Sequence, residues 1–483
     1  MKEVAKMDWM KLGGNVEEKN GVLRGEEGRQ TFVFTADNAP ENFSFEAEIR
    51  LKAAGDAGLY FRTVAKNGVD WLVGYSFTVN VQDHSIKLTK VSNGDHITKV
   101  LGTVHYPFDR DVWYKIAVHM RGENVRLYFN NFLHDDDPYP KFDLKLSHFA
   151  KGAVGLAFGE GVAEFRNVTL KELAPCEEGE TFTNPILYGA DPDILYDEGT
   201  YYLYYTDTAD MTLFQCYTST DLLHWSQPHV VFHGKDGWGN NEYMSPNVIR
   251  KGDWYYMFYA SHTAPDENGK RRAQVTYATS KSPPGPFVSA QKVPLHTDVQ
   301  EIGGAPFLDD DGRAYLTVVR FNNGNECWIM EMKLEDGKVT VLEDTITKMF
   351  AATEPWERDY ANVVEGAVIC KHNGLYYAMY AGSHYKGSYA EGYATAEHPL
   401  GPWKKYAYNP ILTSHLYARA VGDSVYTRTP DGGWVMFYHQ HFSPLEISPR
   451  QIRMDRMKFV KVDDGPDVMV VNGPTMTPQK KLI

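Results

Sequence analysis

A short phrase, a glycine turn followed by an aromatic-rich strand, recurs five times in the later part of this 483-residue chain. The copies read GTYYLYYT, GDWYYMFYAS, GRAYLTVV, GLYYAMYAGS and GGWVMFYHQH, and their reference glycines are Gly199, Gly252, Gly312, Gly374 and Gly433. The spacings of 53, 60, 62 and 59 residues are nearly constant. A β-unit of this length cannot bury its own apolar face, so neighbouring units must pack on one another. The repeat therefore predicts a five-bladed β-propeller.

The first part of the chain, from about residue 9 to residue 173, alternates apolar and polar side chains. In NFSFEAEIRLKA (residues 42–53) the apolar residues fall on one face of an extended strand. Similar segments follow, separated by Gly, Asn and Asp turns, which is typical of an all-β sandwich. We expect an all-β protein with a sandwich at residues 1–173, a linker at 174–183 and a propeller at 184–483.

Composition limits the partners and the location that we expect. The net charge of -14 argues against nucleic acids and anionic membranes as partners. No apolar run approaches the length of a membrane span. The first residues show no apolar signal sequence, and the four cysteines have no CxxC spacing. We expect a cytoplasmic protein, or a secreted or periplasmic one if a leader has been removed.

The phrase NPILYGADPDILYDEGTYYLYYT (residues 184–206) places a carboxylate at the entrance to a strand. Pro192 favours an extended conformation at Asp191, so this side chain would be aimed from a rigid element. The alternative for an isolated Ala-Asp-Pro is a solvated turn aspartate.

Three phrases together carry a family resemblance. They are residues 184–206, VVEGAVICKHNGLYYAMY (363–380) and RQIRMDRMKFVKVDDGPDVMVVNGPTMTPQ (450–479), and they resemble glycoside hydrolase family 43 in content and order. The family consists of five-bladed propeller enzymes, mostly arabinofuranosidases, xylosidases, arabinanases and galactan-active enzymes, so the resemblance implies an oligosaccharide substrate. The first part of the chain, with its closing phrase EFRNVTLKEL, resembles the concanavalin-like (laminin-G-like) jelly rolls found beside glycoside hydrolase domains.

By this resemblance Asp191 is the general base and Glu365 the general acid of an inverting hydrolysis. Such a reaction places a base and an acid about 6.5–9.5 Å apart. The apolar neighbours of Glu365 in VVEGAVI would raise its pKa by desolvation. The family's third carboxylate would stand at Gly303 in EIGGAPFLDDDG. Glu301, two residues earlier and on the same face of an extended strand, is our candidate substitute; the alternative is a rim or solvent-facing glutamate.

Further residues are candidates for contacts with the sugar. Trp238 and Trp356 lie in predicted loops that lead towards these motifs, where a sugar ring could stack on an indole. Tyr360 is a further candidate in the second loop, and Asn247 stands where the family often has an acidic residue. Arg450 matches a family phrase whose arginine reaches the sugar, with a salt bridge that closes the propeller as the alternative.

The resemblance does not predict a metal site for this chain. Where many members have a histidine that binds water or a central metal ion, the phrase AVGDSVYT presents Gly422 and Asp423. Asp423 could still face the propeller axis, and His439 and His441 alternate on one strand. We expect no cofactor, and the alternative is a structural cation in the axis.

Three functions remain to be weighed. The first is a glycoside hydrolase acting on an arabinofuranoside, xyloside or galactoside. The second is a carbohydrate-binding protein with weakened or lost catalysis, favoured by Gly303 and opposed by the Asp191 and Glu365 pair. The third is a related five-bladed hydrolase with an atypical substrate.

Overall fold

The computed structural model describes residues 8–25, 31–53, 55–65, 72–92, 97–130, 139–159, 161–175, 179–462 and 465–482. These form strands and short 3₁₀ turns, and the prediction of an all-β protein with a sandwich and a five-bladed propeller is confirmed. The chain divides into two compact units. One consists of residues 1–183 and 459–480, and the other of residues 184–458 and 481–483.

The first unit is a sandwich of two seven-stranded antiparallel sheets. Along β5 (Asn42–Leu51), buried and partly exposed residues alternate from Phe45 onwards, as its sequence predicts. One sheet contains, in spatial order, β1 (Trp9–Gly13), β4 (Thr31–Thr35), β13 (Ala153–Ala157), β6 (Asp56–Ala65), β7 (Leu72–Asn80), β8 (Ser85–Ser92) and β9 (Ile97–His105). The other contains β12 (Phe142–Lys145), β11 (Asn124–Asn130), β10 (Trp113–Arg121), β5 (Asn42–Leu51), β14 (Ala163–Glu172), β3 (Val22–Gly25) and β2 (Val16–Lys19).

A C-terminal segment belongs to this sandwich unit. Strand β37 (Gln479–Lys480) pairs with β15 (Thr181–Phe182), and β36 (Val468–Val471) lies in the same segment. The buried carboxylate of Asp143 accepts hydrogen bonds from the backbone N–H of Thr477 (2.7 Å) and from Nε2 of Gln479 (2.7 Å). The expected propeller of residues 184–483 begins where the second unit begins, but residues 459–480 of that range belong to the first unit.

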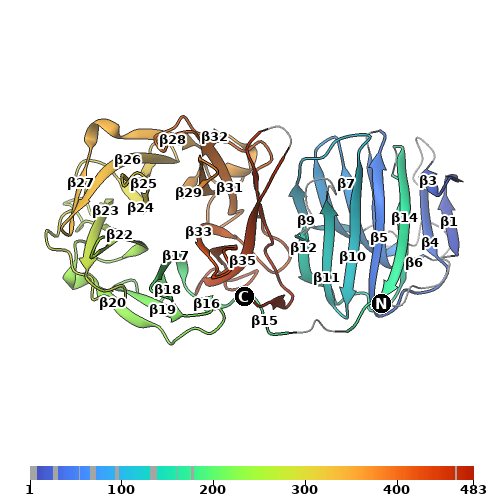
Figure 1. The fold of residues 1–483 in the computed structure, drawn as a ribbon, viewed down its shortest axis with the longest axis horizontal. Helices are drawn as coiled ribbons and strands as arrows, with labels where there is room; N and C mark the ends of the chain where they lie inside the picture. The colour runs from blue at the N-terminus through green and yellow to red at the C-terminus, as the bar shows by residue number, and fades with distance from the viewer. Residues whose placement is uncertain are drawn as a thin grey trace. The chain divides into compact units, whose positions relative to one another are not determined.

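The second unit contains five sheets that follow one another in a ring (Figure 1), from β17 in green to β33 in red. The first blade consists of β17 (Ala190–Asp197), β18 (Thr200–Thr206), β19 (Leu213–Ser219) and β20 (His229–His233), and the second of β21 (Met244–Lys251), β22 (Trp254–His262) and β23 (Ala273–Ser280). The third blade consists of β24 (Glu301–Leu308), β25 (Ala314–Phe321), β26 (Asn325–Glu335), β27 (Lys338–Val341) and β28 (Thr347–Ala351). The fourth blade consists of β29 (Val364–His372), β30 (Leu375–Gly382), β31 (Ala390–Ala396) and β32 (Lys404–Lys405). The 3₁₀ turns are η3 (Gly234–Asp236), η4 (Glu343–Thr345) and η5 (Pro355–Glu357).

The fifth blade closes the ring with a strand from the start of the unit. It consists of β33 (Gly422–Arg428), β34 (Trp434–Gln440), β35 (Gln451–Val460) and β16 (Leu187–Tyr188). The first strands β17, β21, β24, β29 and β33 contact one another in turn, and β33 contacts β17 again. They are therefore the innermost strands. Within the described ranges no helix is long and apolar enough to cross a membrane.

Aromatic side chains fill the space between neighbouring blades. Tyr204 of the first blade packs in one cluster with Tyr259 of the second, and Tyr315 of the third packs in another with Tyr380 of the fourth. All four are at most 1% exposed. A buried aromatic side chain removes a large apolar area from water and still hydrogen-bonds through its hydroxyl. The aromatic strands of the repeat therefore serve mainly as inter-blade core.

Every innermost strand contains a β-bulge near its start. The register shifts occur at residues 190–193, 244–247, 302–305, 365–368 and 422–425. The second residue of each interval has a positive φ, and these five residues, which we call the bulge residues, are Asp191 (48°), Ser245 (52°), Gly303 (63°), Gly366 (63°) and Asp423 (57°). The sequence-based expectation of an extended Asp191 is wrong, because the bulge imposes a left-handed conformation there. For a residue other than glycine this costs about 1–3 kcal/mol, and such strain concentrates at functional sites.

Candidate active site

All five bulge residues line one cavity of about 430 Å³ at the propeller axis. A bulge turns two consecutive residues towards the same side, so this backbone feature repeats around the axis and points five side-chain positions inwards. The other lining residues come from the innermost strands and the loops above them: Thr208, Met211, Glu242, Met244, Ile302, Val319, Glu365, Tyr385, Tyr389, Ser448 and Arg450.

Asp191 is held as an anion by its surroundings. Its Oδ1 accepts a hydrogen bond from Nη1 of Arg450 at 2.9 Å, and its backbone N–H donates to Nδ1 of His439 at 3.2 Å. Burial is the largest effect and opposes ionisation, but Arg450, His439 and hydrogen bonds from Asp423 and Thr206 together outweigh it, and the pKa of Asp191 is lowered to about 2. Asp191 is therefore ionised across the neutral pH range.

The surroundings of Glu365 shift its pKa in the opposite direction, upwards. The hydroxyl of Tyr389 donates to its Oε1 at 2.9 Å, and Nδ2 of Asn325 donates to its Oε2 at 2.8 Å. Burial raises the pKa of Glu365, and the negative charge of Asp191 raises it further, against the effect of these two hydrogen bonds. One cavity thus contains a carboxyl group with a lowered pKa and another with a raised pKa. That arrangement assigns base and acid roles in many hydrolytic sites.

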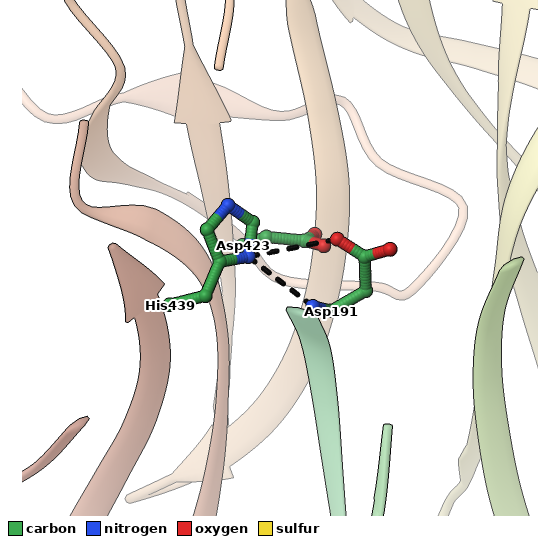
Figure 2. A group of neighbouring side chains, drawn as sticks. All are labelled: Asp191, Asp423 and His439. Carbon is green, nitrogen blue, oxygen red and sulfur yellow. Dashed lines mark hydrogen bonds and ion pairs between the residues drawn. The ribbon is translucent and has the colours of Figure 1, made fainter. Parts of the chain in front are cut away.

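A third carboxyl group, Asp423, is in contact with the first. Figure 2 shows Asp191, Asp423 and His439 with their side chains directed towards one another. Burial and the neighbouring charge of Asp191 raise the pKa of Asp423 well above its usual range, and the two carboxyl groups share a hydrogen bond. Because two carboxyl groups in contact cannot both ionise, Asp423 is the protonated partner.

The same three residues are the one group with metal-binding geometry in the described part of the chain, and each offers a ligand atom within 4.8 Å of the others. Their donor atoms are already engaged. The Arg450 guanidinium lies 2.9 Å from Oδ1 of Asp191 and 3.0 Å from Nε2 of His439. Nδ1 of His439 faces the backbone N–H of Asp191, and Asp423 carries a proton. A dication bound here would have to displace the Arg450 guanidinium from both Asp191 and His439.

The prediction that Glu301 supplies the third carboxylate is corrected by the structure. Glu301 is fully buried and does not line the cavity. Its oxygens lie 2.8 Å from Nδ1 of His296 and 2.8 Å from Nε of Arg320, so it is not a solvent-facing glutamate either. The bulge at Ile302 and Gly303 breaks the strand alternation, and these two residues face the cavity in its place.

The structure brings Arg450 into the cavity together with Asp191 and Glu365, but four other candidates lie outside its lining. The backbone of Trp238 hydrogen-bonds the hydroxyl of Tyr259. Asn247 donates to the carbonyl of Ser245 at 3.1 Å and so supports a bulge.

The remaining two candidates lie in the 355–360 segment. Trp356 lines a second cavity of about 410 Å³, which shares Tyr389 with the first. Tyr360 is 59% exposed and its ring packs on His384.

Sequence reasoning did not assign roles to Asp423, His439, Tyr389 or Asn325. A signal for Asp423 exists in the repeats. When the five first strands are aligned on their bulges, the letters read ADPD, MSPN, IGGA, EGAV and GDSV, and the second column contains both aspartates. Tyr389 and Asn325 have no comparable signal, because both reach Glu365 from outside the innermost strands.

A five-bladed propeller whose axial cavity contains one carboxyl group with a lowered pKa and another with a raised pKa has the architecture of a glycoside hydrolase. Comparison with known proteins agrees. The model of glycosyl hydrolases family 43 matches residues 182–465. A β-D-galactofuranosidase of Aspergillus niger is 26% identical over 310 residues, which cover 60% of this chain and 84% of that protein.

Solved structures agree as well. A thermostable family-43 glycoside hydrolase is 31% identical, covering 62% of this chain and 99% of that one, with a TM-score of 0.55. An endo-1,4-beta-xylanase from Bacteroides thetaiotaomicron is 30% identical, covering 62% and 98%, with a TM-score of 0.53. In addition, residues 4–171 match a 3-keto-alpha-glucoside-1,2-lyase-like domain, a similarity of that region alone.

The chain belongs to glycosyl hydrolases family 43, whose model covers more than half of it. It is a glycoside hydrolase, and the prediction of an enzyme that cleaves O-glycosidic bonds is confirmed.

Proposed function

We propose that the chain removes arabinofuranosyl, xylosyl or galactofuranosyl residues from oligosaccharides with inversion at the anomeric carbon. Asp191 acts as the general base and Glu365 as the general acid. The observation that carries this assignment is the opposite pKa direction of two carboxyl groups in one cavity. The substrate class rests on the relatives, which include a β-D-galactofuranosidase and a xylanase.

In the proposed reaction, Asp191 takes a proton from a water molecule that attacks the anomeric carbon. Glu365 gives its proton to the departing oxygen, so the glycosidic bond breaks without release of an alkoxide. The guanidinium of Arg450 keeps Asp191 ionised and fixes its direction. The hydroxyl of Tyr389 and the amide of Asn325 fix the direction of the acid.

The test is hydrolysis of aryl α-L-arabinofuranoside, β-D-xyloside and β-D-galactofuranoside by the wild type and by Asp191→Asn and Glu365→Gln. General acid and base catalysis each contribute about 10²–10⁴-fold, so each variant should lose at least that factor on substrates with poor leaving groups. Glu365→Gln should lose much less on an activated aryl glycoside, because its leaving group needs no proton. Asp193→Asn is the matched control, since Asp193 is a buried aspartate of the same strand that does not line the cavity.

Proton NMR of the first-formed sugar checks the stereochemistry. Inversion is expected, and a retained configuration would contradict the assignment of Asp191 as a base. Absence of turnover on every glycoside, with sugar binding still measurable by calorimetry, would replace the proposal by a carbohydrate-binding function.

A further inference from the structure

We propose that Asp423 is a positioning residue for the general base: it donates a hydrogen bond to Asp191 and holds that carboxylate in its catalytic direction. The inference rests on the proposed function of Asp191. It assigns a carboxyl group on the fifth blade to the task of orienting a catalytic residue on the first.

The fold places Asp423 and Asp191 at equivalent points. Both are bulge residues with left-handed backbones, φ 57° and 48°, on innermost strands that contact each other, β33 and β17. Aspartate tolerates this conformation better than most residues, yet the strain still has to be supported by the surrounding structure. Of the five bulge residues, these two alone carry carboxyl groups.

The neighbouring blade leaves room for the Asp423 side chain. Strand β29, which carries Glu365, also contacts β33. Its bulge residue is Gly366, and a Cβ atom there would lie 2.1 Å from Oδ1 of Asp423. At Gly303, the bulge residue with the same φ of 63°, a Cβ would meet only Val319 at 3.5 Å. The glycine next to Glu365 therefore leaves the space that the Asp423 carboxyl group occupies.

The charges around Asp423 decide which carboxyl group keeps the proton. The groups facing it are Asp191 from β17, Glu365 from β29, Glu391 from β31, Tyr389 just before β31 and, beyond Asp191, His439 and Arg450. None of the cations contacts Asp423 directly among the described interactions, whereas Arg450 contacts Asp191. The proton therefore stays on Asp423, which can donate it in a hydrogen bond to the Asp191 anion.

Strand β31 supports Asp423 from behind. The carboxyl group of Glu391 accepts hydrogen bonds from the hydroxyl of Ser424 (2.7 Å) and from the backbone N–H groups of Asp423 and Ser424. These contacts hold the bulge in place. The base is thus fixed on two sides, by a guanidinium on one and by a neutral acid on the other.

The experiment compares Asp423→Asn with Asp423→Ala. An asparagine amide is a neutral donor of almost the same shape, so Asp423→Asn should keep a kcat close to that of the wild type. Asp423→Ala removes the donor, and a misdirected catalytic group can cost up to about 10²-fold in rate, so kcat should fall by about 10–100-fold with little change in KM. The acid limb of the kcat/KM profile should move to higher pH in Asp423→Ala alone, because Asp191 loses a hydrogen bond that stabilises its ionised form.

Several outcomes would overturn the proposal. Equal inactivity of both variants would mean that Asp423 acts as an anion. Wild-type behaviour of both would mean that it does not position the base, and a change confined to KM would make it a substrate contact. Infrared spectra of protein labelled at the aspartate carboxyl carbons give a readout that needs no turnover. Asp193, whose pKa burial raises to about 7, contributes to the protonated aspartic acid band in every protein. The wild type should therefore show a stronger band than both variants, and a band of equal strength would refute the assignment.

This design separates the two proposals. If Asp191→Asn remains active, the proposed base is wrong whatever the Asp423 variants do. If Asp191→Asn is inactive and Asp423→Asn is inactive too, the base assignment stands and the positioning role fails.

Discussion

The buried carboxyl group of Glu391 makes the stability of the propeller depend on pH in a calculable way. Glu391 is fully buried in β31, its Oε1 accepts from Ser424, and its Oε2 has no hydrogen-bond partner in the described structure. Burial raises its pKa from the ordinary value of 4.5 to about 8. At about 1.4 kcal/mol per pKa unit, this difference corresponds to a contribution on the order of 5 kcal/mol.

The sign follows from linkage. The folded protein holds this proton more tightly than the unfolded chain, so the stabilisation is fully present below the unfolded pKa of 4.5. It is lost as pH rises towards 8. Glu391→Gln keeps the shape and the acceptor for Ser424 but does not titrate. We therefore expect the free energy of unfolding of Glu391→Gln, relative to the wild type, to rise on the order of 5 kcal/mol between pH 4.5 and pH 8.

Urea unfolding followed by tryptophan fluorescence, at several pH values across this range, measures the difference. Glu397→Gln is the matched control, because Glu397 is an exposed glutamate just beyond the end of the same strand. A difference between Glu391→Gln and the wild type that does not change with pH would refute the reasoning. It would show that Glu391 is ionised when folded.

Three further predictions concern the site and its surroundings. Glu301→Gln should lower the free energy of unfolding by about 3–5 kcal/mol, because it removes the buried anion that pairs with Arg320 and His296, and calorimetry should show this with kcat unchanged; a large loss of kcat would restore Glu301 as a catalytic candidate. Gly366→Ala should reduce kcat far more than Gly303→Ala, since both have φ 63° but only the first places a Cβ 2.1 Å from Asp423; equal losses would attribute the effect to backbone strain alone. Arg450→Gln should move the acid limb of kcat/KM to higher pH, because it removes the positive charge that lowers the pKa of the proposed base; an unmoved limb would contradict that role.

The fold was predictable because it follows from local pattern. The alternation of apolar and polar residues and the constant length of the repeat can both be read from the sequence. Each repeat packs on the repeats next to it in the chain, so the arrangement of the blades follows from their order. Asp191, Glu365 and Arg450 were proposed because their phrases resemble those of the family, and the structure brings all three to the lining of one cavity.

The rest of the site depends on geometry that the pattern does not contain. Glu301 was misplaced because one bulge changes which side of a strand each residue faces. Trp356 was expected to line the sugar site, but its ring packs on the backbone of Gly382 and Gly392 instead. A Cβ atom at these two glycines would come within 2.2 and 2.9 Å of the indole. The sequence of a loop does not indicate which neighbouring surface its side chains pack against. The C-terminal segment carries a family phrase, and nothing in its residues indicates that it joins the sandwich unit.

Strand β16, which closes the ring, links the assembly of the proposed catalytic site to the completion of folding. Residues 187–188 pair with β35, and the N–H of Gly189 donates to the carbonyl of Arg450 at 2.9 Å. The base and its guanidinium are therefore joined by the same contact that connects the last blade to the first. An incomplete ring, whether during synthesis or after local opening of the fifth blade, contains both proposed catalytic carboxyl groups but lacks the contact that fixes the direction of Asp191. We therefore expect hydrolysis only from a chain in which the fifth blade has closed the ring.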